Sequence, residues 1–210
     1  MIEINAEKLA PREVFALLTS IVAPRPIAFV SSISADGKVN LSPFSYFNLG
    51  GANPPSVVFS VTNNREGKEK DTLLNVRETR EYVVNAVTFA MGEAMNVTSA
   101  AFPRGVSEWE MAGFTPEASM RVRPARVSES PVSMECRLHC IVPHGTGPLA
   151  CHYVIGEVLC IRLLDEVLTD GALDPLKLDL IGRMGAAYYC RTGEKSLFTM
   201  ERPAEPPKRV

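Results

Sequence analysis

The sequence predicts a mainly β domain whose antiparallel strands close into a barrel with helices at its sides. Strand-like runs outnumber helical ones, about six or seven against three or so by the periodicity of their apolar residues. Two of these runs, 132–145 and 150–168, are long and rich in β-branched residues, and residues 35–38 have the composition of a hairpin turn. Long antiparallel strands joined by hairpin turns favour a closed barrel over a parallel sheet.

In chain order, the apolar pattern predicts a helix at 6–18, strands at 24–34, 39–48 and 56–62, a helix at 71–79, a strand at 81–88 and a helix at 91–102. Pro11 fits the first turn of the first helix. Asp36-Gly37 supplies the positive φ angles of a two-residue hairpin turn between the first two strands. Asp71 or Thr72 can cap the second helix.

The second half begins with a long excursion, 103–131, which is rich in proline, glycine and charge. We expect short strands in it, and a segment of this length tends to be functional or to wrap a partner. The two long strands follow, and 174–193 reads as a short helix and a turn before a Pro-rich tail. Since no internal repeat or linker divides the chain, we expect a single domain over 1–210 with its core at about 24–190.

Composition narrows the class of partner. The chain has 210 residues, a net charge of -2 and a pI of about 6.0, which leaves no basic surface for nucleic acid. Charge or proline breaks its apolar runs well before the roughly 20 residues of a membrane helix, and the N-terminus has acids where a signal peptide has bases. Five cysteines without a CxxC pair indicate reduced, packed thiols. We expect a cytoplasmic protein with a small-molecule partner and no membrane contact.

Polar side chains gather along the first hairpin. Because residues that flank a tight turn pair across the ladder, Ser31, Ser32 and Ser34 are expected beside Asn40 and Ser42. The result is a row of neutral hydrogen-bond donors.

An anion-binding corner is expected next to this row. Pro43 is predicted to interrupt strand pairing, which would free the backbone amides of 44–47 to face an acceptor such as a phosphate. Lys70 and Thr72 lie at the start of a helix whose first amides also favour an anion.

The residues alone leave two interpretations of segment 40–48 open. Neutral hydrogen-bonding groups, exposed rings and a phosphate-binding corner meet the needs of flavin mononucleotide (FMN), which has a flat ring with polar rim atoms, a ribityl chain and one phosphate. Serine, asparagine and proline are also common turn formers, so the segment can equally be an ordinary β corner.

The chain carries, in this order, the segments RPIAFVSSISADGKVNLSPFSYFN, NPPSVVFSV, KDTLLNVRETREYVVNAV, AMNVTSAAFPRGVSEWEMAGFT and HYVIGEV. Together they resemble the flavin reductase-like, FMN-binding split-barrel family, in the branch loosely called flavoredoxin-like. The similarity runs from about Pro24 to Tyr189, and the order of the segments is more specific than any one of them. It implies a Greek-key split β-barrel with flanking helices, bound FMN, and a homodimer with the flavin near the subunit interface.

The resemblance also implies a set of FMN-binding residues: Ser31 and Ser32 at the ring edge; Asn40 and Ser42 near the ring or ribityl chain; Ser45, Tyr46, Phe47 and Asn48 at the phosphate and ribityl region, largely through backbone amides; and Lys70 and Thr72 supporting the phosphate. No side chain is expected to act as a catalytic group, because the hydride chemistry belongs to the cofactor.

One motif departs from the family. Members that reduce flavin with nicotinamide cofactors carry GDH before a strand that ends in FIGEV, whereas this chain reads GPLACHYVIGEV. Cys151 falls at the histidine position and His152 one place later. Because a one-residue offset sends a side chain to the opposite face of a strand, His152 does not inherit that role, and use of a nicotinamide donor does not follow from the resemblance.

Three further features have competing interpretations. A metal site drawn from the cysteines and histidines of 136–152 is disfavoured, because a regular strand puts Cys136 and Cys140 on one face and His139 on the other. Arg104 and Trp109 either anchor the excursion, with Arg104 paired to an acid, or line the exposed face of the flavin. Arg183 presents the same choice.

Three functions follow from these observations. The first is an FMN-binding oxidoreductase that passes electrons from a donor to flavin or to another acceptor. The donor is NADH, NADPH or a protein, and a monooxygenase or other redox protein is a possible partner. The alternative is a non-catalytic flavin-binding electron carrier without nicotinamide turnover. The third is a barrel that has lost its ligand and acts in assembly.

Overall fold

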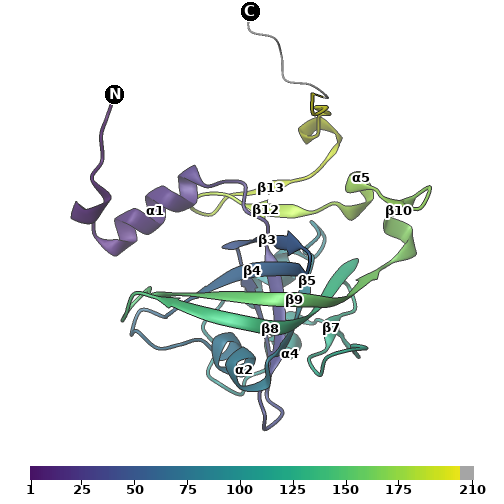
Figure 1. The fold of residues 1–210 in the computed structure, drawn as a ribbon, viewed down its shortest axis with the longest axis horizontal. Coiled ribbons are helices and arrows are strands. Elements are labelled where there is room, and N and C mark those ends of the chain that lie inside the picture. The colour runs from purple at the N-terminus through teal and green to yellow at the C-terminus, as the bar shows by residue number, and fades with distance from the viewer. Residues whose placement is uncertain (204–210) are drawn as a thin grey trace, which may run out of the picture.

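Seven strands form one antiparallel sheet that makes up the body of the protein (Figure 1). The computed structural model describes residues 1–203 of the 210. The strands of this sheet are β1 (Ala28–Ile33), β2 (Val39–Phe44), β3 (Phe47–Ala52), β4 (Pro55–Thr62), β5 (Glu81–Asn85), β8 (Val132–His144) and β9 (Cys151–Leu163). Their order is β2-β1-β5-β8-β9-β4-β3, and every neighbouring pair is antiparallel. The predicted mainly β, antiparallel architecture is confirmed.

The strands β2 and β3 close this sheet into a barrel. They lie at its two opposite edges, yet only Ser45 and Tyr46 separate them in the chain. One bent segment therefore pairs with β1 through its first half and with β4 through its second half. The predicted single strand 39–48 is thus two strands, and the break between them is where the barrel is split.

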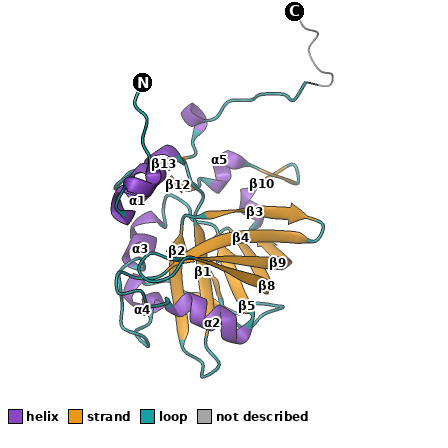
Figure 2. Ribbon diagram, turned by 60° about the vertical axis from the view of Figure 1, so that its left-hand side comes forward, coloured by secondary structure: helices purple, strands orange, loops and turns teal. Residues whose placement is uncertain are grey.

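Helices and short hairpins surround the barrel. The helices of residues 1–203 are α1 (Pro11–Ile21), α2 (Asp71–Thr79), α3 (Gly92–Val97), α4 (Glu108–Ala112) and α5 (Pro175–Leu178), with single 3-10 turns at Ala6–Lys8, Asp165–Val167 and Glu194–Ser196. The hairpins pair β6 (Pro116–Glu117) with β7 (Arg126–Val127), β10 (Leu168–Thr169) with β11 (Ala172–Leu173), and β12 (Ile181–Arg183) with β13 (Tyr189–Arg191). The helices α2, α3 and α4 pack beside β1 and β2 (Figure 2).

The core consists of two clusters separated by the sheet. Side chains of β1 alternate between them, as a pleated strand requires. Ala28 and Val30 join the cluster inside the barrel, whereas Phe29 packs with Leu41 and Trp109 in the cluster beneath α3 and α4. Both faces of β1 are therefore buried, which explains the consecutive apolar residues Ala28, Phe29 and Val30 at its start.

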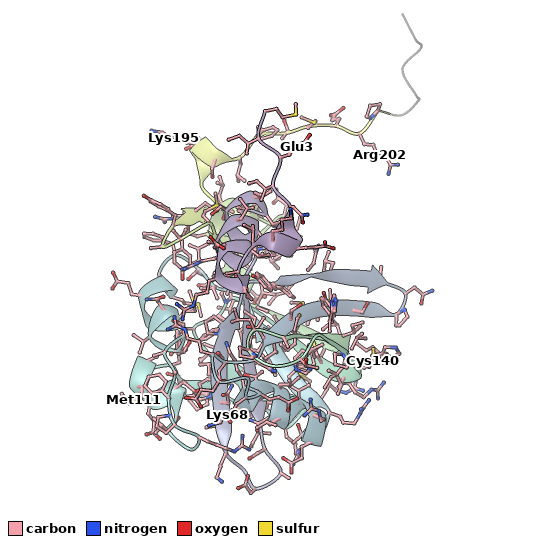
Figure 3. All side chains as sticks on the ribbon, turned by 90° about the vertical axis from the view of Figure 1, so that its left-hand side faces the viewer. Glu3, Lys68, Met111, Cys140, Lys195 and Arg202 are labelled. Atoms are coloured by element: carbon pink, nitrogen blue, oxygen red, sulfur yellow. The ribbon has the colours of Figure 1, made fainter. Side chains whose placement is uncertain are left out.

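The helix α1 and the hairpin β12–β13 form a layer across one end of the barrel, opposite α2 (Figure 1). Of the residues of α1, only Thr19 is buried. In Figure 3, Glu3, Lys195 and Arg202 lie beyond this layer, at the end of the molecule away from Lys68. Both terminal segments thus project from the same end of the barrel.

Other predicted elements also differ from the structure, and the segment 174–193, predicted as a short helix and a turn, holds the hairpin β12–β13 besides α5. Residues 6–8 form a separate 3-10 turn and α1 begins at Pro11, since proline suits the first helical position. The first hairpin turn is not a two-residue turn: the Ser34 amide bonds to the Lys38 carbonyl at 3.0 Å, and only Gly37 has a positive φ, 87°. This arrangement is a three-residue loop with glycine in the left-handed position. The third helix ends at Val97.

No helix within residues 1–203 combines the length and the apolar character needed to cross a membrane.

Candidate functional site

The break between β2 and β3 leaves two backbone amides free. Pro43 does not interrupt pairing, contrary to the prediction: it remains in register with β1, as an edge strand allows when the missing N–H faces away from its neighbour. The Tyr46 carbonyl accepts a hydrogen bond from the Ser60 amide at 2.8 Å. Across the described chain, the amides of Ser45 and Tyr46 donate to no acceptor. Of the predicted set of free amides, 44–47, Phe44 pairs with Ala28 of β1, whereas the bond from Ser60 to Tyr46 makes Phe47 and Phe59 a non-hydrogen-bonded pair, so the Phe47 amide also faces away from β4.

Four of the predicted site residues are buried, toward the hairpin-turn end of β1 and β2. Ser31, Ser32, Asn40 and Thr72 are exposed by 1%, 2%, 6% and 1%. Asn40 Nδ2 donates to Thr72 Oγ1 at 2.8 Å, and Asn75 Nδ2 donates to Ser32 Oγ at 3.2 Å. Ser31, on the other face of β1, donates to a backbone carbonyl of the excursion at 2.5 Å. These groups attach α2 and the excursion to the first hairpin.

The other six predicted residues keep contact with solvent. Four of them are half-buried, namely Ser42, Ser45, Tyr46 and Phe47. The other two, Asn48 and Lys70, are exposed. Lys70 is distant in sequence from the break, but the fold brings the two together. Its Nζ lies 5.6 Å from the centre of the ring of Phe44, the last residue of β2.

The N-terminus of α2 is an uncapped helix end beside this lysine. Lys70 is the N-cap residue, and its side chain cannot accept a hydrogen bond from the first turn. Within residues 1–203, the amides of Asp71 and Thr72 have no acceptor. The Asp71 carboxylate is engaged by Arg104 at 2.6 Å. Free amides at a helix N-terminus attract anions.

Two pKa shifts describe the electrostatics of the break. Desolvation lowers the pKa of Lys70, because the ammonium is stabilised less than a fully hydrated one. Part of the side chain nevertheless remains exposed to water. Burial raises the pKa of Tyr46, and the nearby positive charge of Arg25 partly offsets this effect. The Tyr46 phenol therefore stays protonated and neutral in the physiological range.

Arg25 is a component of the site that the sequence analysis missed. This arginine is 6% exposed. Its Nη1 donates to the carbonyls of Thr19 and Val22, its Nη2 donates to the Met184 carbonyl at 2.9 Å, and its Nε donates to Ser45 Oγ at 3.4 Å. One guanidinium thus joins α1, β12 and the break. The only sequence signal was the placement of an arginine just before a buried strand.

The prediction that Cys136 and Cys140 share one face of a regular strand is wrong. A bulge between Leu138 and Cys140 reverses the side-chain faces of β8, so that Cys136 and Ile141 point into the barrel core, and Cys140 does not share the face of Cys136. No group of metal-ligating side chains occurs in the part of the chain that the structure describes. All five cysteines are free thiols.

His152 faces the barrel interior. It is 9% exposed, its Nε2 lies 3.1 Å from Asn63 Oδ1, and its Nδ1 has no partner among residues 1–203. Cys151, one residue earlier, points to the opposite face, in agreement with the predicted offset.

The competing interpretations of the excursion are decided in favour of anchoring. Arg104 pairs with Asp71 and also donates to Asn75 Oδ1 at 3.4 Å. Trp109 is 5% exposed within the cluster under α3 and α4. In the same segment, burial raises the pKa of Glu108, whose Oε2 accepts a hydrogen bond from the Leu41 amide at 3.2 Å.

A bent strand that splits a small antiparallel barrel defines the class of split-barrel proteins. The flavin reductase like domain family model matches residues 22–184, and the chain belongs to this family. The resemblance found in the sequence is confirmed.

Solved structures extend this comparison. Nitrilotriacetate monooxygenase component B from Bacillus cereus is 34% identical, with 95% of this chain and 98% of that chain covered and a TM-score of 0.89. The 2-nitrobenzoate 2-nitroreductase NbaA of Pseudomonas fluorescens is 30% identical over 99% of both chains, with a TM-score of 0.85. Flavoredoxin of Desulfovibrio vulgaris shares the fold at 18% identity, with 97% and 98% covered and a TM-score of 0.75.

Proposed function

We propose that this protein binds FMN at the break between β2 and β3 and acts, as a single domain, as an FMN-dependent oxidoreductase. The observation that carries the proposal is the pairing of two sets of unused donors: the amides of Ser45 and Tyr46, and the uncapped N-terminus of α2 with Lys70. Such donors fit a phosphate, which prefers backbone amides and a helix N-terminus together with a positive charge. Lys70 lies against Phe44, next to the break, so both sets can act on one ligand.

The residues of the site divide into contacts and supports. The phosphate is held by the Ser45 and Tyr46 amides and by the Lys70 ammonium. Ser42 and Asn48 offer polar groups to the ribityl chain, and the rings of Tyr46 and Phe47 offer flat apolar surface. The buried residues Ser31, Ser32, Asn40 and Thr72 support the site by holding α2 and the excursion against the hairpin.

Bound FMN would supply the electron-transfer chemistry. The protein binds and orients the cofactor and controls local charge. The neutral Tyr46 phenol adds no negative charge beside the phosphate, because burial keeps its pKa above the usual value. Arg25, fixed by the carbonyls of α1 and β12, holds Ser45 in position.

The function is tested by mixing the purified protein with FMN and either NADH or NADPH in air. Turnover followed at the nicotinamide absorbance band supports the oxidoreductase. A yellow complex that consumes neither nicotinamide points to the electron carrier. Colourless protein that ignores added FMN contradicts both and favours a barrel without a ligand.

The electron carrier is kept as a second candidate because of one observation. His152 is buried and faces the barrel interior, and the residue at the position of the family histidine is Cys151. A protein that lacks this histidine at the flavin would take electrons from a protein donor. The similarity to component B of a Bacillus cereus monooxygenase supports a further alternative, in which a monooxygenase partner receives the reduced flavin.

We also propose that the protein is a homodimer, as the family resemblance implies, and that it assembles through α1. The helix exposes Phe15, Leu18 and Ile21 by 52%, 51% and 66%. These residues recur at helical spacing, so they form one apolar stripe, and a second copy of the chain is the occupant that would cover it. The five free thiols fit a reducing compartment, and we propose the cytoplasm.

A further inference from the structure

A cavity of about 150 Å³ opens on the side of the break away from Lys70. Its apolar walls come from Ile27, Met95 and Tyr189, and its polar groups come from Ser45, Ser99 and Arg183. An apolar cavity of about this volume accommodates one benzene-sized ring. The cavity adjoins the break, because Ser45 belongs to both.

The charge in this cavity is unbalanced. Arg183 forms no ion pair with an acid of residues 1–203. Its Nη2 donates one hydrogen bond, to the Ala186 carbonyl at 2.7 Å. Most of the five N–H groups of the guanidinium are therefore unused within these residues. Its guanidinium carbon lies 4.4 Å from the centre of the Tyr189 ring, so stacking fixes its plane. Desolvation chiefly, and also the positive charge of Arg183, lowers the pKa of buried Arg25. A bound anion would relieve this repulsion.

The hydroxyl of Ser45 is available to the same anion. It accepts a hydrogen bond from Arg25 Nε at 3.4 Å, which leaves its own hydrogen free to donate. Ser99 is different, because its hydroxyl already donates to the Asn96 carbonyl at 2.6 Å. The side-chain donors that remain in this lining are therefore Ser45 and Arg183.

A second cavity, of about 440 Å³, adjoins the first at Tyr189 and continues between α3 and the β12–β13 hairpin. Phe89, Ile181 and Gly92 line it, together with the acid Glu93. The negative charge of Glu93 disfavours an anion in this outer space, whereas Arg183 favours one in the inner space. A ligand is thus oriented with its charge inward and its apolar part outward.

We propose that the inner cavity binds a small aromatic acid, with its carboxylate on Arg183 and the Ser45 hydroxyl and its ring between Ile27, Met95 and Tyr189. Substituents on the ring would extend into the outer cavity. Binding of the acid needs no flavin. If FMN binds at the break, the ring of the acid would lie beside the flavin, as an electron acceptor must. This consequence rests on the proposed function.

The test is titration calorimetry of benzoate into the protein without FMN. Benzoate is expected to bind. Benzamide keeps the ring but lacks the charge, and acetate keeps the charge but lacks the ring. Both are expected to bind at least about tenfold more weakly than benzoate, which corresponds to a loss of about 1.4 kcal/mol. Absence of benzoate binding, or equal binding of all three, overturns the proposal. Adenosine monophosphate serves as a competitor, and tighter binding of it than of benzoate would assign the cavity to a dinucleotide instead.

Variants identify the anion partner. Arg183→Gln is expected to weaken benzoate at least about tenfold, a loss typical of a charge-assisted hydrogen bond, while Arg183→Lys, which keeps the charge, is expected to retain more affinity. The matched control is Arg191→Gln, because Arg191 is paired with Asp179 at 2.5 Å and lines neither cavity. Equal losses in the Gln variants of both arginines contradict the assignment. Folding of each variant is checked by circular dichroism.

FMN titration of the same variants separates the two sites. Arg183→Gln is expected to bind FMN as the original protein does. If it loses FMN affinity to the same extent as benzoate affinity, the cavity belongs to the flavin site and the proposal fails. Benzoate binding by a protein that ignores FMN would leave the aromatic-acid site standing and refute the proposed function alone.

Discussion

Replacement of Lys70 by methionine tests the phosphate site most directly. Methionine keeps an unbranched apolar stem against the Phe44 ring and removes the charge. Two unit charges 4 Å apart attract by about 1 kcal/mol in water and about 4 kcal/mol near a protein surface of intermediate polarity. Because Lys70 is exposed, we take the lower part of this range, about 1 to 2 kcal/mol, which corresponds to a loss in FMN affinity of about fivefold to thirtyfold. Fluorescence titration of FMN measures this loss.

Riboflavin, which has no phosphate, provides the comparison ligand. Its affinity is expected to be the same for Lys70→Met and for the original protein, and the FMN difference should shrink as salt rises, since ions screen an exposed contact. Lys68→Met is the control variant, because Lys68 is paired with Glu66 at 2.7 Å on the same loop. Equal losses for FMN and riboflavin, or an unchanged FMN affinity, would refute the placement of the phosphate at Lys70.

The pH dependence follows from the same group. Desolvation places the pKa of Lys70 in the folded protein below its ordinary value of 10.5. At pH values between the pKa of Lys70 in the folded protein and its pKa in the unfolded chain, the unfolded chain binds more protons than the folded one. The contribution of Lys70 to the stability of the unliganded protein therefore rises with pH over this range. FMN affinity should fall over the same range, because the ammonium loses its charge. Lys70→Met is expected to abolish both trends, and thermal unfolding and FMN titration at several pH values check them.

Three other predictions concern separate parts of the molecule. Ser42→Ala combined with Ser45→Ala should weaken FMN binding by about 1 to 3 kcal/mol while the protein stays folded; unchanged affinity would remove these serines from the pocket. Gly156→Ala should destabilise the barrel by about 1 to 3 kcal/mol or more in denaturant unfolding, because its Cβ would lie 1.8 Å from the buried Tyr82 hydroxyl; a stability equal to that of the original protein would contradict this close packing. Leu18→Glu should convert a dimer to a monomer in sedimentation velocity, and a dimer that persists would place the interface elsewhere.

The elements predicted best are those governed by local pattern. Helix α2 spans 71–79 as predicted, and β4, β8 and β9 begin within one residue of the predicted strands. Their apolar periodicity is set by neighbours in sequence, so it can be read without knowing the tertiary contacts. The break at Ser45 and Tyr46 could not be placed in this way, because it arises where one segment changes partner from β1 to β4.

The candidate site shows the same division. The resemblance implied ligand contacts for Ser42, Ser45 and Lys70, and these side chains do reach solvent. The burial of Ser32, Asn40 and Thr72 depends on α2 packing against the hairpin. The role of Arg25 could not be predicted, because it contacts a carbonyl 159 positions away in the chain and no local pattern indicates that contact.

The sequence by itself determined the fold class, most of the strands and helices, the polar character of the 40–48 segment and the membership of a flavin-related family. These properties depend on residue type and on spacing along the chain. Only the tertiary structure decided which polar groups are used up inside the protein and which remain free. Hydrogen bonds between distant segments consume Ser32, Asn40 and Thr72, whereas the Ser45 and Tyr46 amides and most N–H groups of Arg183 have no acceptor within residues 1–203, because the segments that pack around them supply none.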